Sequence, residues 1–525
     1  MVVHKELTKE KTIFREFIKI DEMTLSRLIL FLAFLGGTVL RVWMINAMGY
    51  NTDEAVYSGQ AAAIAGVPVL EDIFPIFRAH PLLFQVLLSI VYQFQFSDLA
   101  GRLFAVAIGL GTIFLTFQTG KLLYGRIPGA LAALFIALMP YHVLVTRQVL
   151  LDGPMVFFAT LSLYFLVQFG YSQKSIWIYF TGASMGLTFL AKETSIILMG
   201  AIYSFLALAS DIKIRIRDVI ISIFLWILVI LPFPVSIALA GSSTTGRNYL
   251  AWQLFRRPNH DWSFYFNNVP PSIGILLIAA AIIGVILLWK HRSWKEKLLL
   301  CWILIPLTFF QIWPVKGFQY LLPIAPPLAI LAGRLLGKLA TESDTISLSP
   351  FFAKFSYYRL ASWVVTGVIV LSLFGTSWQR IQPEISTRFM AGTGGVPGGR
   401  EAGEWVKNNA PLNSTFMTIG PSMANIIKFY GQRPAYGLSV SPNPLHRNPA
   451  YTPINNPDAQ IRRSEIQYII WDSFSASRST FFSDKLMGYV KLYNGRAIHT
   501  ESITVTDTDG KPVVQPIIII YEVHP

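Results

Sequence analysis

Long apolar segments follow one another from residue 25 to residue 378, and they constrain this chain more than any other feature. By run length we expect about eleven membrane-spanning helices, because a helix of about 20 apolar residues crosses a bilayer. The expected spans are 25–46, 100–119, 127–145, 151–169, 175–191, 195–210, 218–240, 272–290, 298–313, 318–337 and 360–378. Only 14% of the residues are charged, whereas soluble domains carry about 25%. The sequence therefore predicts a polytopic α-helical membrane protein.

The two ends of the chain differ from this apolar middle. Residues 1–24 contain a basic, amphipathic stretch, and the apolar run that follows is too long for a signal peptide, so we expect an uncleaved first span and a cytoplasmic N-terminus. Residues 25–378 are the expected membrane domain. From residue 379 to residue 525 the sequence is polar, with expected strands that include 489–493 and 517–521, which predicts a small α/β domain. An odd number of spans puts that domain outside the cytoplasm.

Basic residues support this topology. Lys and Arg gather in the loops expected to be cytoplasmic, as the positive-inside rule requires. They are Lys121, Arg126, Lys174, Lys213, Arg215, Arg217, Lys290, Arg292, Lys295, Lys297, Arg334, Lys338, Lys354 and Arg359. This bias explains much of the net charge of +14, and no basic cluster with interleaved aromatic residues indicates a nucleic-acid partner. The one cysteine, Cys301, excludes an intrachain disulfide. In a cell without internal membranes, we expect the protein in the plasma membrane.

Ionisable residues also occur at the outer ends of the expected spans, where topology does not require them. Two outer loops are long, residues 49–99 and 241–271, and the second mixes cations with aromatic residues, as an interface belt or a contact with sugar or lipid would. The outer ionisable residues are Asp53, Glu54, Arg78, His80, Arg102, Arg147, Asp152, Lys192, Glu193 and Lys316. Such groups are costly at membrane depth and usually face a cavity or each other. Their shared side and alternating sign predict an outward-facing site.

Each of these residues also has a purely structural interpretation. Thr52 or Asp53 could cap a helix that we expect from Asp53 to Ala65, and acids in a first turn favour the helix dipole. Asp152 could pair with Arg147, which lies five residues earlier. The remaining cations could extend to lipid headgroups. These interpretations explain the residues one at a time but not their common position.

Six short motifs carry a resemblance to a known family. In chain order they are Asp53-Glu54, Arg78-Ala79-His80-Pro81-Leu82, Ala100-Gly101-Arg102-Leu103, Arg147 to Pro154, Gly186 to Glu193, and Lys316 to Pro323 with Pro326-Pro327. Their order resembles the GT-C superfamily of polyprenyl-phosphate-sugar glycosyltransferases, in the branch of the protein O-mannosyltransferases and lipid A aminoarabinose transferases. The match extends from about residue 25 to residue 340 and leaves the polar tail uncovered. Two departures are a single proline, Pro81, after His80, and Gln319 where an arginine is frequent.

The resemblance implies an inverting transfer of a sugar from a polyprenyl-phosphate donor to an acceptor hydroxyl on the extracytoplasmic side. The leaving group is an anionic lipid phosphate, so the transfer needs cations close to it. The candidates to bind the donor phosphate are Arg78, His80, Arg102, Arg147, Lys192 and Lys316. Asp53 is the expected general base, since one carboxylate suffices for a single displacement. Glu54 is expected to support the loop or pair with a cation, and Asp152 to orient an acceptor or an arginine.

Three points stay open at the level of sequence. No close His, Cys and Asp cluster with metal-ligand spacing occurs, so we expect no obligatory metal, although Asp53, His80 and Asp152 could converge on a divalent cation. The acceptor is a protein, a lipid or a glycan. The alternative function is a transporter or flippase of lipid-linked or small polar substrates. The absence of a visible repeat, and acids at the outer span ends instead of the midplane, favour the enzyme.

Overall fold

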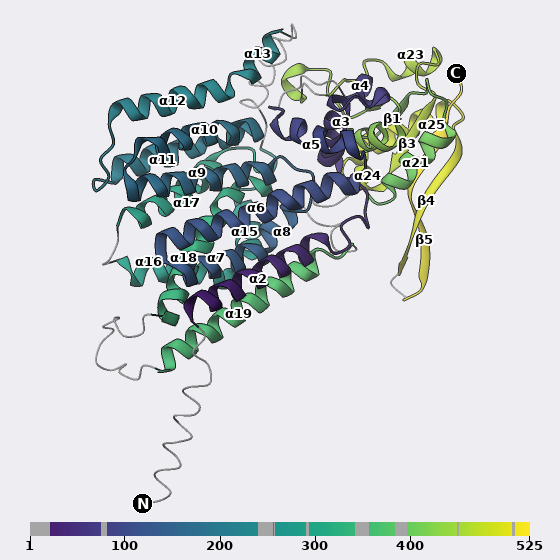
Figure 1. The fold of residues 1–525 in the computed structure, drawn as a ribbon. Coiled ribbons are helices and arrows are strands. Elements are labelled where there is room, and N and C mark those ends of the chain that lie inside the picture. Colours follow the sequence, from purple (N-terminus) through teal and green to yellow (C-terminus); the bar gives the residue numbers. More distant parts are fainter. Residues whose placement is uncertain are drawn as a thin grey trace, which may run out of the picture.

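The protein consists of a large helical domain beside a smaller domain that contains a β-sheet (Figure 1). The computed structural model describes residues 21–74, 81–239, 256, 258–289, 293–341, 356–383, 396–448, 451–506 and 510–525. The main helices of the large domain are α2 (Glu22–Val42), α6 (Asp98–Tyr124), α7 (Arg126–Leu138), α8 (Pro140–Thr146), α9 (Asp152–Ser172), α10 (Ser175–Ala191), α11 (Ile197–Leu208), α12 (Ile216–Ile230), α13 (Pro232–Leu239), α15 (Phe264–Ile273), α16 (Ile275–Leu287), α17 (Trp294–Ile312), α18 (Ala325–Thr341) and α19 (Ser356–Arg380). Each expected span contains at least part of one of these helices.

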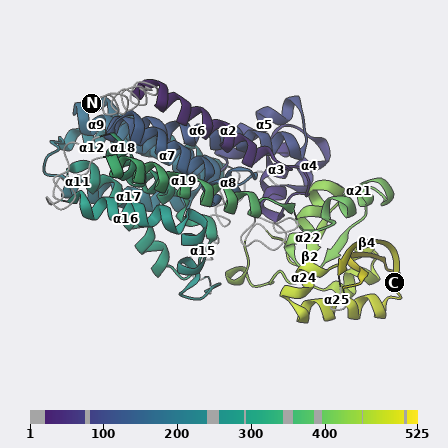
Figure 2. The same cartoon turned by 90° about the horizontal axis from the view of Figure 1, so that it is seen from below.

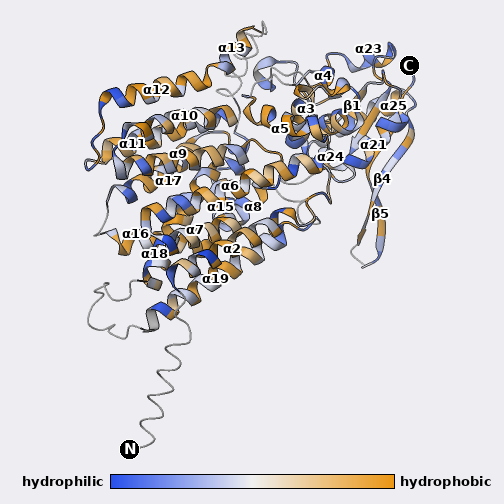
Figure 3. Ribbon diagram, viewed as in Figure 1, coloured by the Kyte–Doolittle hydropathy of each residue, from blue (hydrophilic) through white to orange (hydrophobic). Residues whose placement is uncertain are grey.

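The helices vary in their ability to cross a membrane. Among the described residues, 6 helices are long and apolar enough to cross, and the bent pairs α7–α8 and α15–α16 raise the number to 8. The polytopic membrane fold is thus confirmed, while the count of about eleven spans stays a prediction because α10 and α11 are short. Apolar residues cover the outside of the bundle (Figure 3), and α12 exposes Ile220, Phe224 and Leu228 as a lipid-facing helix would.

Helix α7 is the centre of the bundle. All residues from Ile127 to Leu138 are buried, and α2, α6 and α18 pack around them (Figure 2). Small residues allow this close packing. A Cβ at Gly129 would lie 2.5 Å from the backbone nitrogen of Lys121 on α6, so no side chain fits at this position.

The outer loop after α2 folds into three short helices, α3 (Thr52–Ile64), α4 (Pro68–Ile73) and α5 (Leu83–Phe94). The predicted α3 is confirmed, but the predicted cap is wrong. Asn51 caps α3, because its side-chain oxygen accepts the N–H groups of Asp53 and Glu54 at 2.9 and 3.0 Å. The turn at Gly66, with φ +84°, follows the C-terminus of the helix as expected.

The smaller domain contains a mixed sheet of strand order β2-β1-β3-β5-β4. Its strands are β1 (Phe416–Thr418), β2 (Ala435–Gly437), β3 (Tyr468–Asp472), β4 (Arg496–Thr506) and β5 (Pro512–Glu522). Strand β1 is parallel to β2 and β3, and β5 is antiparallel to β3 and β4. The helices are α21 (Gly399–Asn409), α22 (Pro421–Ile426), the π-helical turn η5 (Ile427–Gly431), α23 (Pro457–Arg462), α24 (Ser473–Arg478) and α25 (Thr480–Leu492).

One strand expected in this domain is wrong. Residues 489–493 form the end of helix α25, where Leu486, Val490 and Tyr493 bury one helical face. These three residues recur at the three- to four-residue spacing of a helix. The apolar final strand is confirmed within β5, where Ile517, Ile518 and Ile520 are buried.

Candidate active site

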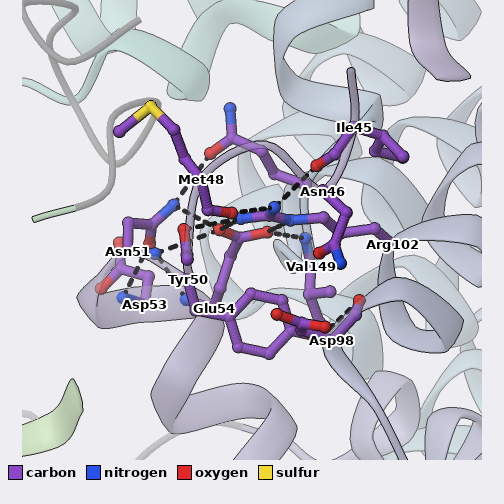
Figure 4. Close-up of polar contacts among 12 residues, drawn as sticks. Ile45, Asn46, Met48, Tyr50, Asn51, Asp53, Glu54, Asp98, Arg102 and Val149 are labelled. Atoms are coloured by element: carbon purple, nitrogen blue, oxygen red, sulfur yellow. Dashed lines mark hydrogen bonds and ion pairs between the residues drawn. The ribbon is translucent and has the colours of Figure 1, made fainter. Parts of the chain in front are cut away.

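The carboxylate of Glu54 is the most completely bound acidic group of the outer loop (Figure 4). It is 1% exposed and accepts both Nε and Nη2 of Arg102, at 2.9 and 2.8 Å. The same carboxylate accepts the backbone N–H groups of Asn51 and Val149, each at 3.1 Å. Glu54 therefore ties the start of α3 to α6 and to the segment between α8 and α9. The prediction that it supports the loop and pairs with a cation agrees with this geometry.

Arg102 uses every N–H group of its guanidinium inside the protein. Besides the two bonds to Glu54, it donates to the backbone oxygens of Ile45, Met48 and Gly49 at 2.7 to 2.9 Å. An arginine has five N–H donors, and all five are occupied here. We therefore correct the assignment of Arg102 to the donor phosphate, because no donor remains for one.

Asp53 differs from its neighbour Glu54 in exposure. It lies in the first turn of α3 and is half-buried, whereas Glu54 is buried. Asp152 begins α9 and accepts two hydrogen bonds from Nζ of Lys192, at 2.8 and 2.9 Å. The possible pairing of Asp152 with Arg147 is thus wrong, because Lys192 binds both carboxylate oxygens. Lys192 follows α10 in extended conformation, and this break in the helix delivers its side chain to the site.

A second buried cation, Lys316, belongs to the segment that also carries Tyr320. Nζ of Lys192 lies 5.0 Å from the ring centre of Tyr320, whose ring in turn packs on Gly317. Lys316, next in sequence, is 4% exposed, and its Nζ donates to the backbone oxygen of Gln311 at 2.8 Å. The described contacts join Asp152 to Lys192 and Lys192 to Tyr320, and Lys316 lies four residues before Tyr320 in the chain.

Aromatic rings surround the ammonium group of Lys316. Its Nζ lies 5.3 Å from the ring centre of Trp262 and 5.4 Å from that of Tyr265. Both rings come from the long outer loop and the start of α15. Cations near aromatic faces are stabilised by the ring quadrupole, so this site holds a positive charge at low exposure.

An apolar cavity of about 550 Å³ begins at these aromatic rings. Trp262, Tyr265 and Gln311 line one end, next to Lys316, and the walls come from α15, α16, α17 and α18. Its other lining residues are almost all apolar, including Ile282, Leu304 and Leu328. The cavity therefore combines a cationic end with an apolar length.

Three other residues predicted to bind the donor phosphate are Arg147, Arg78 and His80, and the structure describes only the first. Arg147 donates to the backbone oxygens of Trp43 and Ile381, and lines a cavity of about 50 Å³ with Arg380. Arg78 and His80 lie outside the described residues. Within the described part of the chain no three His, Cys, Asp or Glu residues gather as metal ligands, so metal independence stays a prediction.

The smaller domain contacts the loop that carries Asp53. Arg400 donates to the backbone oxygens of Asn46 and Met48 and forms an ion pair with Asp98 at 2.7 Å. Tyr430 donates to Asp98 at 3.0 Å and accepts the backbone N–H of Tyr50. Burial, and then the nearby charge of Asp98, raises the pKa of Tyr430, so its hydroxyl keeps its proton. This domain therefore contributes to the geometry of the site.

Several of these residues were not predicted as part of the site. Asn51, Tyr265 and Tyr320 lie beside predicted residues in sequence, and Tyr320 belongs to the motif that contains Lys316. The role of Arg400 and Tyr430 has no local sequence signal, because it depends on contacts across more than 300 residues.

Comparisons with known proteins agree with this architecture. Residues 79–237 match the family model of dolichyl-phosphate-mannose-protein mannosyltransferase, and residues 259–391 match the Alg9-like mannosyltransferase family. No significant match was found among curated proteins. The crystal structure of ArnT from Cupriavidus metallidurans in the apo state has a TM-score of 0.66 at 14% identity, with 95% of this chain and 98% of that chain covered.

Two similar structures contain lipid phosphates. ArnT from Cupriavidus metallidurans bound to undecaprenyl phosphate has a TM-score of 0.64 at 12% identity, and covers 95% of this chain and 97% of that chain. The oligosaccharyltransferase AglB from Archaeoglobus fulgidus, in complex with an inhibitory peptide and a dolichol-phosphate, has a TM-score of 0.57 at 12% identity, with 94% and 74% covered. The shared fold and the two mannosyltransferase family matches support a membrane glycosyltransferase of the GT-C superfamily.

Proposed function

We propose that the protein transfers a sugar from a polyprenyl-phosphate donor to a hydroxyl of its acceptor, with inversion, on the extracytoplasmic side of the plasma membrane. The observation that carries this proposal is the apolar cavity of about 550 Å³ whose lining residues Trp262, Tyr265 and Gln311 contact the buried ammonium group of Lys316. A polyprenyl tail needs an apolar surface and its phosphate needs a cation. The lipid phosphates bound to the two similar structures fit the same donor class.

The donor would lie with its isoprenoid chain between α16, α17 and α18 and with its phosphate near Lys316. Backbone oxygens and aromatic rings hold Nζ of Lys316. Among the described residues no carboxylate contacts this Nζ, so its positive charge is available to a phosphate. By contrast, Lys192 forms a bidentate pair with Asp152. We therefore assign the direct electrostatic stabilisation of the leaving phosphate to Lys316, and the positioning of Asp152 to Lys192.

Asp53 is the proposed general base. It removes the proton of the acceptor hydroxyl while that oxygen attacks the anomeric carbon from the face opposite the phosphate. The bond from the anomeric carbon to the phosphate oxygen breaks, and its electron pair leaves with the polyprenyl phosphate. Glu54 is unsuited to this role because its oxygens accept five hydrogen bonds from Arg102, Asn51 and Val149. Asp53 is the more accessible of the two adjacent acids.

The test uses the purified full chain in lipid nanodiscs with a panel of undecaprenyl-phosphate-linked hexoses and pentoses. Release of undecaprenyl phosphate is measured for the wild type, for Asp53→Asn, and for Asp72→Asn, which changes an exposed acid of the same outer loop. We expect Asp53→Asn to lower the rate by about 10²–10⁴-fold and Asp72→Asn to leave it unchanged. A wild-type rate in Asp53→Asn would show that the base is a different group. Movement of the donor across the bilayer without release would instead identify a flippase.

A further inference from the structure

A polar cavity of about 290 Å³ is lined by residues of both domains. The membrane domain contributes Asn46 and Asp98, which Figure 4 shows beside the Glu54–Arg102 pair. The smaller domain contributes helix α21 and the turn η5. Small-molecule sites are frequent at domain interfaces, and their volumes start at roughly 300 Å³. A cavity of this size accommodates one or two sugar rings.

One wall of the cavity is a polar stripe on α21. Arg400, Glu404 and Lys407 are spaced four and three residues apart, so they share one helical face. Arg400 pairs with Asp98 at 2.7 Å across the domain boundary. Two acidic and two basic side chains line the cavity, namely Asp98, Glu404, Arg400 and Lys407, so their formal charges cancel. A strongly charged ligand would meet like charges on part of the lining. The wall favours a neutral ligand with many hydrogen-bonding groups.

The turn that packs against α21 has an unusual backbone. Phe429 and Tyr430 belong to the π-helical turn η5, and Gln432 follows it in the left-handed region with φ +50°. π-Helical turns and left-handed non-glycine residues are rare and concentrate at functional sites. The lining residues of the cavity include Phe429, Tyr430 and Gln432. Aromatic, amide and charged side chains together suit a ligand that has an apolar face and several hydroxyls, such as a pyranose.

We propose that this cavity binds a neutral saccharide unit of the acceptor. The assignment to the acceptor rests on the proposed transferase function, whereas the binding of a saccharide does not. The cavity shares Arg400 and Tyr430 with the contacts that hold the loop of Asp53. A bound saccharide would therefore touch the residues that position the general base, and it would hold the acceptor chain at the edge of the site.

Saturation-transfer difference NMR on the full chain in lipid nanodiscs tests the binding. The probes are methyl α-D-mannopyranoside, methyl β-D-glucopyranoside and methyl β-D-galactopyranoside. We expect saturation transfer to at least one probe, and a loss of at least threefold in two variants, Lys407→Ala and Gln432→Gly. The second variant removes the amide while glycine accepts the positive φ without strain. Asn494→Gly changes another left-handed residue of this domain, outside the cavity, and should keep the wild-type signal.

Two results would overturn the proposal: no transfer to any of the three probes, or an undiminished signal in both cavity variants. The source of the saccharide is tested separately with a glycan-bearing acceptor in the transfer assay. We expect Gln432→Gly to raise the KM for that acceptor at least fivefold and to leave the KM for the donor unchanged. If Gln432→Gly loses pyranoside binding but keeps the wild-type KM for the acceptor, the cavity binds a free saccharide and not a unit of the acceptor. Pyranoside binding without any sugar transfer would refute the transferase proposal and leave the saccharide site intact.

Discussion

The backbone N–H of Tyr50 donates a hydrogen bond of 2.8 Å to the hydroxyl of Tyr430, a residue 380 positions later in the chain. The same hydroxyl donates to Asp98 at the start of α6. Tyr50 directly precedes Asn51, which caps the helix that carries Asp53. The hydroxyl of Tyr430 therefore joins the smaller domain to both ends of the outer loop, at Tyr50 and at Asp98. Tyr50 lies three residues before Asp53, the proposed base.

Replacing Tyr430 by Phe should slow transfer without weakening donor binding. The change leaves the Tyr50 N–H without a partner, which costs about 1–3 kcal/mol when the group stays buried. We expect kcat to fall several-fold and the KM for the donor to stay constant, because the loop moves while the apolar cavity does not. Steady-state kinetics of Tyr430→Phe beside Tyr436→Phe, a control in the same domain, would measure this. A wild-type kcat in Tyr430→Phe would mean that the domain contact does not position the base.

Glu54→Gln should unfold the outer loop, where Asp53→Asn should not. Removing one partner of a buried ion pair destabilises a protein by about 3–5 kcal/mol, since the other charge is left buried and unpaired. We expect a lower thermal midpoint for Glu54→Gln and a midpoint close to wild type for Asp53→Asn. The double variant Glu54→Leu/Arg102→Met, which removes both charges, should recover part of the loss. Equal midpoints for the two single variants would contradict the assigned roles.

Variants of the Asp152–Lys192 ion pair should show whether the pair is needed for stability, for sugar transfer, or for both. Asp152→Asn leaves the buried ammonium group of Lys192 without its bidentate partner, so this variant should lose about 3–5 kcal/mol of stability. Asp152→Asn/Lys192→Met removes both charges and should regain much of it. We expect both variants to be inactive in the transfer assay. Activity in the stable double variant would show that the pair has only a structural function.

A bulky side chain in the apolar cavity should select against long donors. Ile282 lines the cavity from α16, and its neighbour Ile283 is exposed outside it. We expect Ile282→Trp to raise the KM for an undecaprenyl donor about tenfold, a change of ~1.4 kcal/mol in binding. The KM for a farnesyl donor should change less, and Ile283→Trp should change neither. An equal effect on both chain lengths would mean that the tail lies elsewhere.

Asp472 should make the smaller domain less stable as the pH rises. Its side chain is fully buried, one carboxylate oxygen has no hydrogen-bond partner, and burial raises its pKa to about 6. The folded state then binds a proton that the unfolded state releases near pH 4, so stability falls between about pH 4 and pH 6 and stays lower above that range. The difference amounts to ~3 kcal/mol.

The variant Asp472→Asn tests this pH dependence. Asn keeps the cap of α24, in which the side chain accepts the N–H of Ser475, and it carries no charge to bury. Thermal unfolding of the full chain should show a higher midpoint for the variant at pH 7 and equal midpoints near pH 3.5. A wild-type midpoint that rises from pH 4 to pH 6 would contradict the raised pKa.

Periodicity and motif order were sufficient to predict the membrane fold, whereas the position of the site stays a prediction. Apolar run length located each helical segment, and the acids and cations at the outer ends of spans led to Asp53, Asp152, Lys192 and Lys316. Pairing could not be predicted in the same way. Arg102 and Lys192 are both cations at the outer end of a span, yet Arg102 is saturated by Glu54 and three backbone oxygens while Lys192 meets Asp152.

The contacts that the smaller domain makes with the outer loop could not be predicted from the sequence. Arg400 and Tyr430 form contacts that depend on the final placement of two domains, and neither residue lies in a motif shared with the membrane helices. The strand predicted at residues 489–493 failed for a related reason. Alternating apolar residues in a short segment fit a strand or a helix face equally well, and packing against β3 decides between them.

The bond between Tyr50 and Tyr430 also imposes an order on biogenesis. A ribosome adds roughly 5–20 residues per second, so on the order of 20–80 s separate the synthesis of these two residues. All membrane helices leave the ribosome during that interval, before the partner of the outer loop exists. The helices that line the apolar cavity are therefore made before the hydroxyl that contacts the outer loop, and under the proposed function sugar transfer awaits synthesis of the smaller domain.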